Sequence, residues 1–501
     1  MQRKYEQLKS RLAEVDDLAA SAALLSWDQE TSMPPGGAGA RGRQMATLSR
    51  IAHQKLTSPA VGRLLDALQP WAEGLPYDSM EASLVRVARR AFERETRVPS
   101  SFVSRQVEHE AATYEVWAQS RPKNDWARVY PYLEKMLDLS REYSGFFPGY
   151  DHPIDPLIDR EDYGVRASAL KVLFERLREY LVPMVRSITA QPPADSSCLH
   201  RTFPPDRQRE FFTAMIRSVG YDYDRGLQSV SPHPFTTKFS IGDVRFTTRC
   251  LPNDLGEALF GFLHEGGHAL YEQGVDWSLE NTILAEGTSA GVHESQSRLW
   301  ENVVGRSWSF WLYWYPRLQA AFAAQLSDVP LDVFYRAINK VQRSVIRTEA
   351  DEVTYDLHVM IRFGLEMDML EGRLAVRDLP QAWRERYQSD LGIAPPDDRD
   401  GVLQDVHWYS GPIGGSFQGY TLGNVLAAQF YATALHEHPE IPEELASGKF
   451  DTLLGWLQDK IYRHGTKYTP SELVERVAGG PIQIEPYIAY LRAKYGELYQ
   501  L

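Results

Sequence analysis

The pattern His-Glu-x-x-His at positions 264 to 268 constrains the fold more than any other feature of the sequence. Residues four positions apart lie about 40° apart on one face of an α-helix. His264 and His268 can therefore direct two imidazole rings at one point, as the first two ligands of a tetrahedral metal ion must. Glu265 lies one step round the helix, where it can act as a base on a water molecule beside that metal. The alternative is a helix with two surface histidines.

The flanking residues favour a helix around this pattern. Asn253 or Asp254 is a candidate N-cap and Gly274 a candidate C-cap. Gly266 and Gly267 each cost a helix about 1 kcal/mol relative to alanine. We therefore expect another backbone, or a substrate, to approach this part of the helix closely. A buried stripe is expected from Leu255, Leu259, Phe260, Phe262, Leu263 and Leu270.

A third metal ligand is expected on the following helix. The clearest candidate is Glu294, because a turn followed by an antiparallel helix would bring it back beside the two histidines. Two histidines, one carboxylate and a water molecule form the usual set of a catalytic zinc site. On spacing alone, Glu286 and His293 remain alternatives. A further alternative is that Glu294 pairs with Arg298, four residues later, on a solvated face.

The composition describes a globular protein without an organising disulfide framework. Hydrophobic residues make up 43% and charged residues 24% of the 501 residues. A net charge of −13 argues against a general nucleic-acid binder. The two cysteines fit a reducing cytoplasm. The apolar run 18–27 is too short for a signal peptide, and no run is long enough to predict a membrane helix.

Hydrophobic spacing predicts one large, mainly α-helical body without an interdomain linker. The one convincing β element is a hairpin at 234–250, with an edge strand to which a peptide could add by main-chain pairing. The alternative is a purely structural hairpin. A long helical stretch is expected from Leu331 to Gly372, with a break near Phe363-Gly364. Further helices are expected over 5–27, 80–97, 126–143, 165–189, 207–219, 284–304, 420–435 and most of 453–501.

Two positions after the metal helix suit substrate recognition. Arg347 could bind a carboxylate with both guanidinium arms while Asp351, four residues later, orients it. The alternative is a simple Arg-Asp pair on a helix. His407 lies between an acidic loop and a Gly-rich loop, so it could enter a cleft and stabilise an oxyanion. A histidine beside Trp408 could equally be a packed or surface residue.

Together these motifs resemble the thermostable carboxypeptidase family, the carboxypeptidase Taq-type metallocarboxypeptidases. The resemblance covers nearly the whole chain. It is carried by His233-Pro234-Phe235, Asp243-Val244-Arg245-Phe246-Thr247, His264-Glu265-Gly266-Gly267-His268, His293-Glu294-Ser295-Gln296, Ile346-Arg347-Thr348-Glu349-Ala350-Asp351, Gly401 through Gln404-Asp405 to His407-Trp408, and the N-terminal Trp27 to Pro34.

The resemblance implies a role for most of these residues. His264, His268 and Glu294 match the zinc ligands, Glu265 the general base, and Arg347 the residue that holds the substrate's C-terminal carboxylate. His407 matches a histidine at the catalytic cleft, and Arg245 a cleft residue of unassigned role. The implied fold is almost all helical and neurolysin-like, a single unit over residues 1–501 with two lobes around a deep substrate groove. Zinc or cobalt as the metal, a peptide with a free C-terminal carboxylate as substrate, and a homodimer are also implied.

One loop departs from the family pattern. Many members carry Gly-Tyr-Phe-Pro after the His-Trp pair, whereas here the region reads Gly414-Gly415-Ser416-Phe417-Gln418-Gly419-Tyr420. Tyr420 either replaces the family tyrosine at the substrate or merely begins the next helix. The main prediction is a carboxypeptidase. The alternatives are an endo-oligopeptidase on the same metal site, a metal-dependent peptide-binding protein without turnover, and a structural zinc site.

Overall fold

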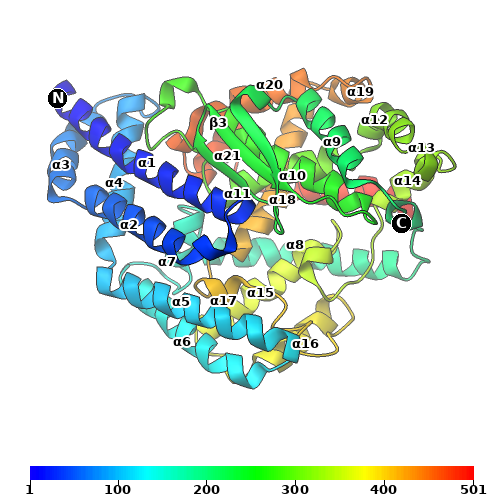
Figure 1. The fold of residues 1–501 in the computed structure, drawn as a ribbon, viewed down its shortest axis with the longest axis horizontal. Helices are drawn as coiled ribbons and strands as arrows, with labels where there is room; N and C mark the ends of the chain where they lie inside the picture. The colour runs from blue at the N-terminus through cyan, green and yellow to red at the C-terminus, as the bar shows by residue number, and fades with distance from the viewer.

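The computed structural model describes all 501 residues and consists of 22 α-helices with one small sheet (Figure 1). The predicted mainly α-helical fold is confirmed. The helix predicted over 5–27 is part of a longer one, α1 (Gln2–Thr31), and the helix predicted over 80–97 is α4 (Met80–Arg97), with the same bounds. No helix combines the length and the apolarity needed to cross a membrane.

The N-terminal helices form a layer whose small hydrophobic core also includes Ile241 of the hairpin turn and apolar residues of the segment 275–285. Trp27, near the end of the first helix, packs edge-on against Phe235 and Phe239 of the β element. This contact holds the layer against the sheet, which the blue helix α1 crosses in Figure 1. The helices of this layer are α1 (Gln2–Thr31), α2 (Ala38–Leu56), α3 (Pro59–Glu73) and α4 (Met80–Arg97).

The other buried hydrophobic residues form two cores of equal size, with 52 residues in each, so neither is an appendage of the other. The first core lies in the lower part of Figure 1. It is built mainly by α5 (Ser100–Ser120), α6 (Trp126–Gly145), α7 (Asp155–Glu161), α8 (Ala167–Thr189), α15 (Tyr355–Leu370), α16 (Leu379–Asp390), α17 (His407–Ser410) and α22 (Glu485–Tyr499).

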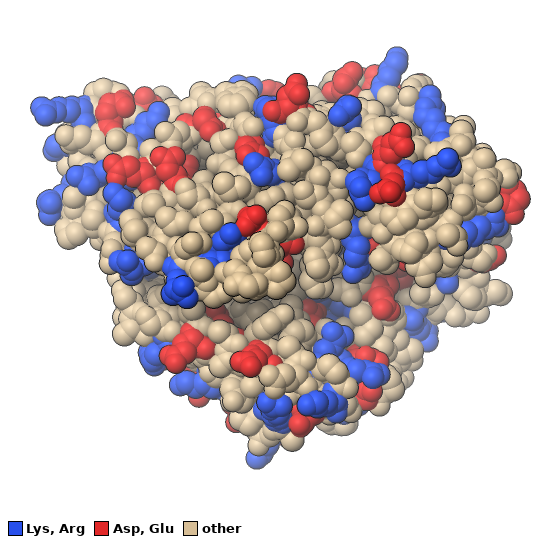
Figure 2. All heavy atoms as spheres, viewed as in Figure 1, with Lys and Arg blue, Asp and Glu red and all other residues tan.

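The second core lies in the upper part of Figure 1, around the sheet. On the face shown in Figure 2, the surface is hollowed below the sheet, between the upper and the lower part of the molecule. The second core is built by α9 (Pro205–Val219), α10 (Leu255–Gln273), α11 (Ala290–Arg298), α12 (Trp308–Ala321), α13 (Ala323–Leu326), α14 (Leu331–Ile338), α19 (Ile441–Ala446), α20 (Asp451–Lys460) and α21 (Pro470–Ala478).

One central helix, α18 (Phe417–Glu437), belongs to both cores. Phe417 and Val425 pack in the first core, and Leu426 and Phe430 in the second. This explains why residues 417–430, apart from the half-buried Tyr420, are buried all round rather than along one stripe, including polar residues such as Gln418 and Asn424. The helix also packs closely on α11, because a Cβ at Gly423 would lie only 2.4 Å from Cγ of Glu294 on that helix.

The sheet confirms the predicted hairpin and adds a strand that the sequence analysis missed. The strands β1 (Gly226–Val230), β2 (Thr236–Ser240) and β3 (Asp243–Thr248) lie in the order β1-β3-β2. β2 pairs antiparallel with β3, and β1 pairs parallel with it. The hairpin strand β2 is therefore an edge strand, as predicted.

The long helix expected from Leu331 to Gly372 is wrong. The structure has two helices there, α14 and α15, separated by an irregular segment over 339–354 that contains a short turn at Arg347–Glu349. Asp351 explains the interruption, because its carboxylate accepts hydrogen bonds from the backbone amides of Gln342, Val353 and Thr354. The predicted break at 363–364 is also wrong, since α15 runs through it.

Candidate metal centre

The helix α10 carries the two histidines of the motif on one face, and Glu272 lies one turn further along the same face. Its N-cap is Asp254, whose Oδ1 accepts the amide of Glu257 at 3.2 Å, and Gly274 follows its last residue. The predicted caps are thus confirmed. His264, His268 and Glu272 are four residues apart and lie on one face.

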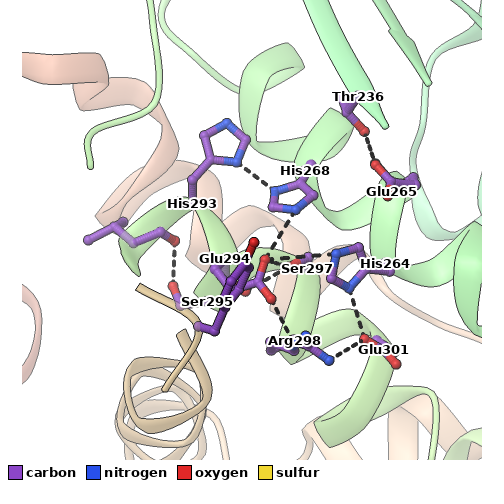
Figure 3. A network of polar contacts seen from close by, with 12 residues as sticks. Thr236, His264, Glu265, His268, His293, Glu294, Ser295, Ser297, Arg298 and Glu301 are labelled. Carbon is purple, nitrogen blue, oxygen red and sulfur yellow. Dashed lines mark hydrogen bonds and ion pairs between the residues drawn. The ribbon is translucent and has the colours of Figure 1, made fainter. Parts of the chain in front are cut away.

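The helix α11 runs antiparallel to α10 and turns its own charged residues toward this face. Glu294, Arg298 and Glu301 recur at helical spacing, and Glu301 lies in a π-helical segment, Leu299–Val304, that continues α11. Nδ1 of His264 lies 2.8 Å from Oε2 of Glu301. Figure 3 shows the two sets of side chains meeting between the helices.

His264, His268 and Glu294 are the three side chains that the structure brings together as a metal-binding set, with ligand atoms within 4.8 Å of one another. Oε2 of Glu294 lies 3.8 Å from Nε2 of His264 and 3.4 Å from Nε2 of His268. Tetrahedral bonds of zinc to nitrogen and oxygen place neighbouring ligand atoms roughly 3.3 Å apart. The donor set and its spacing therefore fit a catalytic zinc ion. Of the alternatives considered for the third ligand, neither Glu286 nor His293 belongs to this set.

Glu294 and His264 each use one polar atom to bind a neighbouring side chain, and the other polar atom faces the remaining metal ligands. Arg298 donates from Nε to Oε1 of Glu294 at 2.7 Å, so Oε2 faces the histidines. The same guanidinium donates to Glu301 at 3.1 Å, and Glu301 in turn holds His264. The pairing of Glu294 with Arg298, considered above as an alternative to metal binding, is therefore present and compatible with it.

Glu294 is buried and the two histidines are half-buried, and their surroundings shift the pKa values of the histidines in opposite directions. Burial opposes protonation of His264, but Glu294 and Glu301 outweigh it and raise the pKa of His264 to about 9. For His268, burial dominates and lowers the pKa to about 4. Despite burial, Arg298 and the histidines hold the pKa of Glu294 well below its usual range, so this carboxylate is ionised.

Glu265 lies beside this set and is held by the edge strand β2. The hydroxyl of Thr236 donates to Oε2 of Glu265 at 2.7 Å. Glu265 is 7% exposed, and burial raises the pKa of its carboxyl. A carboxylate with a raised pKa suits a base that must take a proton and later give it back.

Close packing explains why the motif contains Gly266 and Gly267 although glycine lowers helix stability relative to alanine. A Cβ at Gly267 would lie 2.6 Å from the backbone oxygen of Gln296, and one at Gly266 would lie 2.3 Å from the side chain of Ile216. On the other side of α11, a Cβ at Gly423 of α18 would lie 2.4 Å from Cγ of Glu294. The helix that carries Glu294 is thus held between α10 and α18 at positions where only glycine fits.

We expect Gly267→Ala to destabilise the protein by about 1–3 kcal/mol, because backbone atoms of α11 must move to admit the new methyl group. Metal affinity should fall with it, since Glu294 moves with α11. Gly261→Ala on the same helix is the matched control. Its Cβ meets nothing within 4 Å, so it should stabilise α10 by about 0.5–1 kcal/mol. Thermal unfolding of both variants tests the pair, and equal effects would contradict the packing explanation.

A second polar cluster surrounds Arg347, which lines the same cleft as His264 and Glu265. Arg347 is 7% exposed and donates from Nε and Nη2 to Asp405, at 2.6 and 3.2 Å. Its Nη1 donates to the hydroxyl of Tyr355 at 2.9 Å. The prediction that Asp351 orients Arg347 is wrong, because the carboxylate of Asp351 binds nearby backbone amides instead. Asp405 takes that role.

Asp405 also holds Arg362 and His407. Arg362 donates from Nε to Oδ2 of Asp405 at 2.9 Å, and Nδ1 of His407 lies 2.6 Å from Oδ1. Although burial opposes ionisation, these partners hold the pKa of Asp405 well below its usual range. Because a carboxylate only accepts, Nδ1 of His407 must carry the proton. Nε2 of His407 lies 2.9 Å from the hydroxyl oxygen of Tyr420.

Arg245 lies away from the metal set. On β3 it pairs with Thr237, whereas Thr236 and Lys238 of β2 are the residues that face α10. Side chains alternate along a strand, so Arg245 occupies the face of the sheet turned away from α10. There both arms of its guanidinium bind Asp243, each at 2.7 Å, and its Cζ lies 4.9 Å from the ring centre of Phe239.

Comparison with known proteins agrees with this arrangement. A family model described as "Carboxypeptidase Taq (M32) metallopeptidase" matches residues 7–495. "Thermostable carboxypeptidase 1" of Thermus thermophilus is 40% identical over 507 residues, covering 99% of each chain. "Carboxypeptidase 1" of Bacillus subtilis is 35% identical and covers 98% of this chain and 97% of its own length.

Solved structures are similar over the whole chain. The crystal structure of an M32 carboxypeptidase from Deinococcus radiodurans is 47% identical, with a TM-score of 0.97 and 100% coverage of both chains. Metallocarboxypeptidase 1 of Trypanosoma cruzi is 30% identical, with a TM-score of 0.94, and the match covers 99% of this chain and 100% of that one.

Proposed function

The chain belongs to the carboxypeptidase Taq (M32) metallopeptidase family, and on this premise we propose how its residues share the work of a metallocarboxypeptidase. The metal is zinc, bound by His264, His268 and Glu294, and cobalt can substitute for it. The substrate is a peptide with a free C-terminal carboxylate, whose last residue is released by hydrolysis. The observation that carries the proposal is that His264, Glu265 and Arg347 line one cleft.

The bound metal supplies positive charge that acidifies a water molecule and polarises the scissile carbonyl. The carboxylate of Glu265 takes a proton from the attacking water and delivers it to the leaving amine. Thr236 holds Oε2 of Glu265 throughout, which keeps the carboxylate in one orientation. Burial of Glu265 supports this role because a raised pKa makes its carboxylate a stronger base toward the water.

Arg347 is the anchor for the C-terminal carboxylate. Within its cluster, two guanidinium groups, Arg347 and Arg362, share the single carboxylate of Asp405, which leaves one positive charge in excess. Arg347 also keeps one N–H on each Nη beyond the bonds to Asp405 and Tyr355. A peptide carboxylate can accept these donors and balance the charge. Its position then fixes which peptide bond lies at the metal.

Arg298 connects the anchor to the metal set. Its guanidinium holds Glu294, and its Cζ lies 4.5 Å from the ring centre of Tyr355, whose hydroxyl receives Arg347. A carboxylate bound at Arg347 is therefore placed relative to the metal ligands through three side chains in direct contact. We propose that the cleft between the two large cores is the substrate groove, with one lobe on each side.

His407 and Tyr420 act as a pair in stabilising the oxyanion. In the structure Nε2 of His407 is occupied by the hydroxyl of Tyr420. The hydroxyl of Tyr420 donates to the oxyanion, and its contact with Nε2 of His407 orients it. Asp405 in turn fixes the ring of His407 through Nδ1. Although Tyr420 lies within α18, the contact of its hydroxyl with Nε2 of His407 supports a role for it at the site.

The test is a digest of one peptide as its free carboxylate and as its C-terminal amide, followed by mass spectrometry. We expect stepwise loss of single residues from the free peptide alone, and loss of this activity when a chelator removes the metal. Activity should return on adding zinc or cobalt. Internal cuts in both peptides would instead establish an endo-oligopeptidase, and metal binding without cleavage would establish a binding protein.

A further inference from the structure

Nδ1 of His264 is held by the carboxylate of Glu301, whereas Nδ1 of His268 has no carboxylate partner. Nδ1 of His268 lies 2.6 Å from Nδ1 of His293, which projects from α11 toward it (Figure 3). Nε2 of His293 lies 2.8 Å from Oε1 of Glu272, four residues after His268 on α10. His293 therefore fills the space between two successive side chains of the metal helix.

The polar contacts run in series from His268 through His293 to Glu272, and the series ends at Lys238 on the edge strand β2. Nζ of Lys238 on β2 lies 3.2 Å from Oε2 of Glu272, and the amide of Gly287 donates to Oε1 at 3.0 Å. The side chains of Lys238 and Glu272 are only 12% and 8% exposed. Neither Nζ of Lys238 nor Oε2 of Glu272 makes a hydrogen bond with another residue, so the ion pair is the one polar contact between Lys238 and the series. A buried lysine and a buried carboxylate oxygen of this kind compensate each other's charge.

Metal binding fixes the direction of every hydrogen bond in this series. His268 binds through Nε2, so its Nδ1 carries the proton and donates to His293. Nδ1 of His293 then accepts, and its Nε2–H donates to Glu272, which only accepts. The ionised carboxylate is balanced by Lys238. No proton has to move, and a single tautomer of each histidine satisfies all donors and acceptors.

We propose that His293, Glu272 and Lys238 are positioning residues that fix the tautomer and ring orientation of His268 for metal binding. This inference rests on the role of His268 as a metal ligand in the proposed function. Outer partners of metal-bound histidines typically change metal affinity 10- to 100-fold when they are lost. Here the outer partner is a second histidine, so the support comes from three elements, α11, α10 and β2.

The same strand face also holds the base. Thr236 and Lys238 are two residues apart on β2, so both point at α10, where they bind Glu265 and Glu272. One strand therefore orients the proton acceptor and, through the chain of three residues, one metal ligand. This gives the hairpin a function that does not depend on whether a peptide adds to its edge.

The experiment measures zinc affinity by competition with a chromophoric chelator, and the visible spectrum of the cobalt-loaded protein. We expect His293→Ala to bind zinc about 10- to 100-fold more weakly, with an altered cobalt spectrum. His293→Asn keeps an acceptor near Nδ1 of His268 and should recover part of the loss. Glu272→Gln, which weakens the hold on His293, should lie between wild type and His293→Ala.

Glu286→Gln is the matched control, because Glu286 lies near Lys238, Glu272 and His293 but makes no hydrogen bond with them. It should bind zinc within about twofold of wild type, well short of the change that outer partners give. Thermal unfolding of the metal-free proteins separates structural effects. Zinc affinity and a cobalt spectrum unchanged in His293→Ala would overturn the inference while leaving the proposed function intact. A wild-type protein that binds neither metal would overturn both.

Discussion

Glu265→Gln should lower kcat by about 10²- to 10⁴-fold while leaving metal binding unchanged. Glutamine matches the size of glutamate and still offers an oxygen to Thr236, so the geometry around α10 is kept. What it lacks is the ability to take a proton from water. The measurement pairs kcat on a free-carboxylate peptide with zinc content of the same preparation. KM should change little, because Glu265 acts on the water and not on the terminal carboxylate.

The matched control for this variant is Glu257→Gln. Glu257 lies two turns earlier on α10, lines the same cleft and is bound by Arg249 at 2.7 Å, but it is absent from the metal set. Its replacement should leave kcat close to wild type. Zinc content that falls in Glu265→Gln as steeply as kcat would contradict the assignment, because Glu265 would then be acting on the metal ligands and not as the base.

The sequence predicted the parts of the site that follow from local helix geometry. His264 and His268 are fixed by the four-residue spacing, and Glu294 by the return of an antiparallel helix. The supporting residues carry a similar signal, since Glu272 and Glu301 continue the stripes of α10 and α11. Charged residues at helical spacing are typical of solvated surfaces, however. Only the packed pair of helices shows that these two faces meet.

The contacts of Arg347 could not be predicted in this way. Its partner Asp405 is 58 residues away, and both lie in irregular segments. The segment 339–354 contains no glycine or proline to interrupt a helix, so its hydrophobic pattern favoured one. The side chain of Asp351 binds three backbone amides and stabilises the irregular form. Side-chain capping of this kind depends on a folded arrangement that periodicity does not contain.

The missing strand β1 has a related cause. Gly226–Val230 has no turn that links it to the hairpin, and it pairs parallel with β3, so the evidence for it is a contact distant in sequence. Its consequence for the site is direct. β1 makes β3 the central strand and leaves β2 at the edge, where Thr236 and Lys238 can face α10.

Arg347→Ala should lower kcat/KM for free-carboxylate peptides by about 100- to 1000-fold, the cost of losing a charged partner in a buried site. Any residual cleavage of the matching amidated peptide should stay as low as in the wild-type protein, since that peptide never uses the anchor. The preference for a free C-terminus is therefore the quantity to measure. Arg347→Lys keeps the charge but not the two-armed geometry, so its loss should be intermediate.

The fold should survive this substitution, because Asp405 keeps Arg362 and His407 as partners. Thr348→Ala is the matched control: Thr348 adjoins Arg347 in the same cleft but is not among the residues whose side chains hydrogen-bond Asp405. It should retain the wild-type preference. If the preference for the free carboxylate persisted in Arg347→Ala, the anchor would have to be another cation near the metal. If zinc content fell in parallel with activity, Arg347 would be supporting the metal set through Tyr355 and Arg298, and not reading the C-terminus of the substrate.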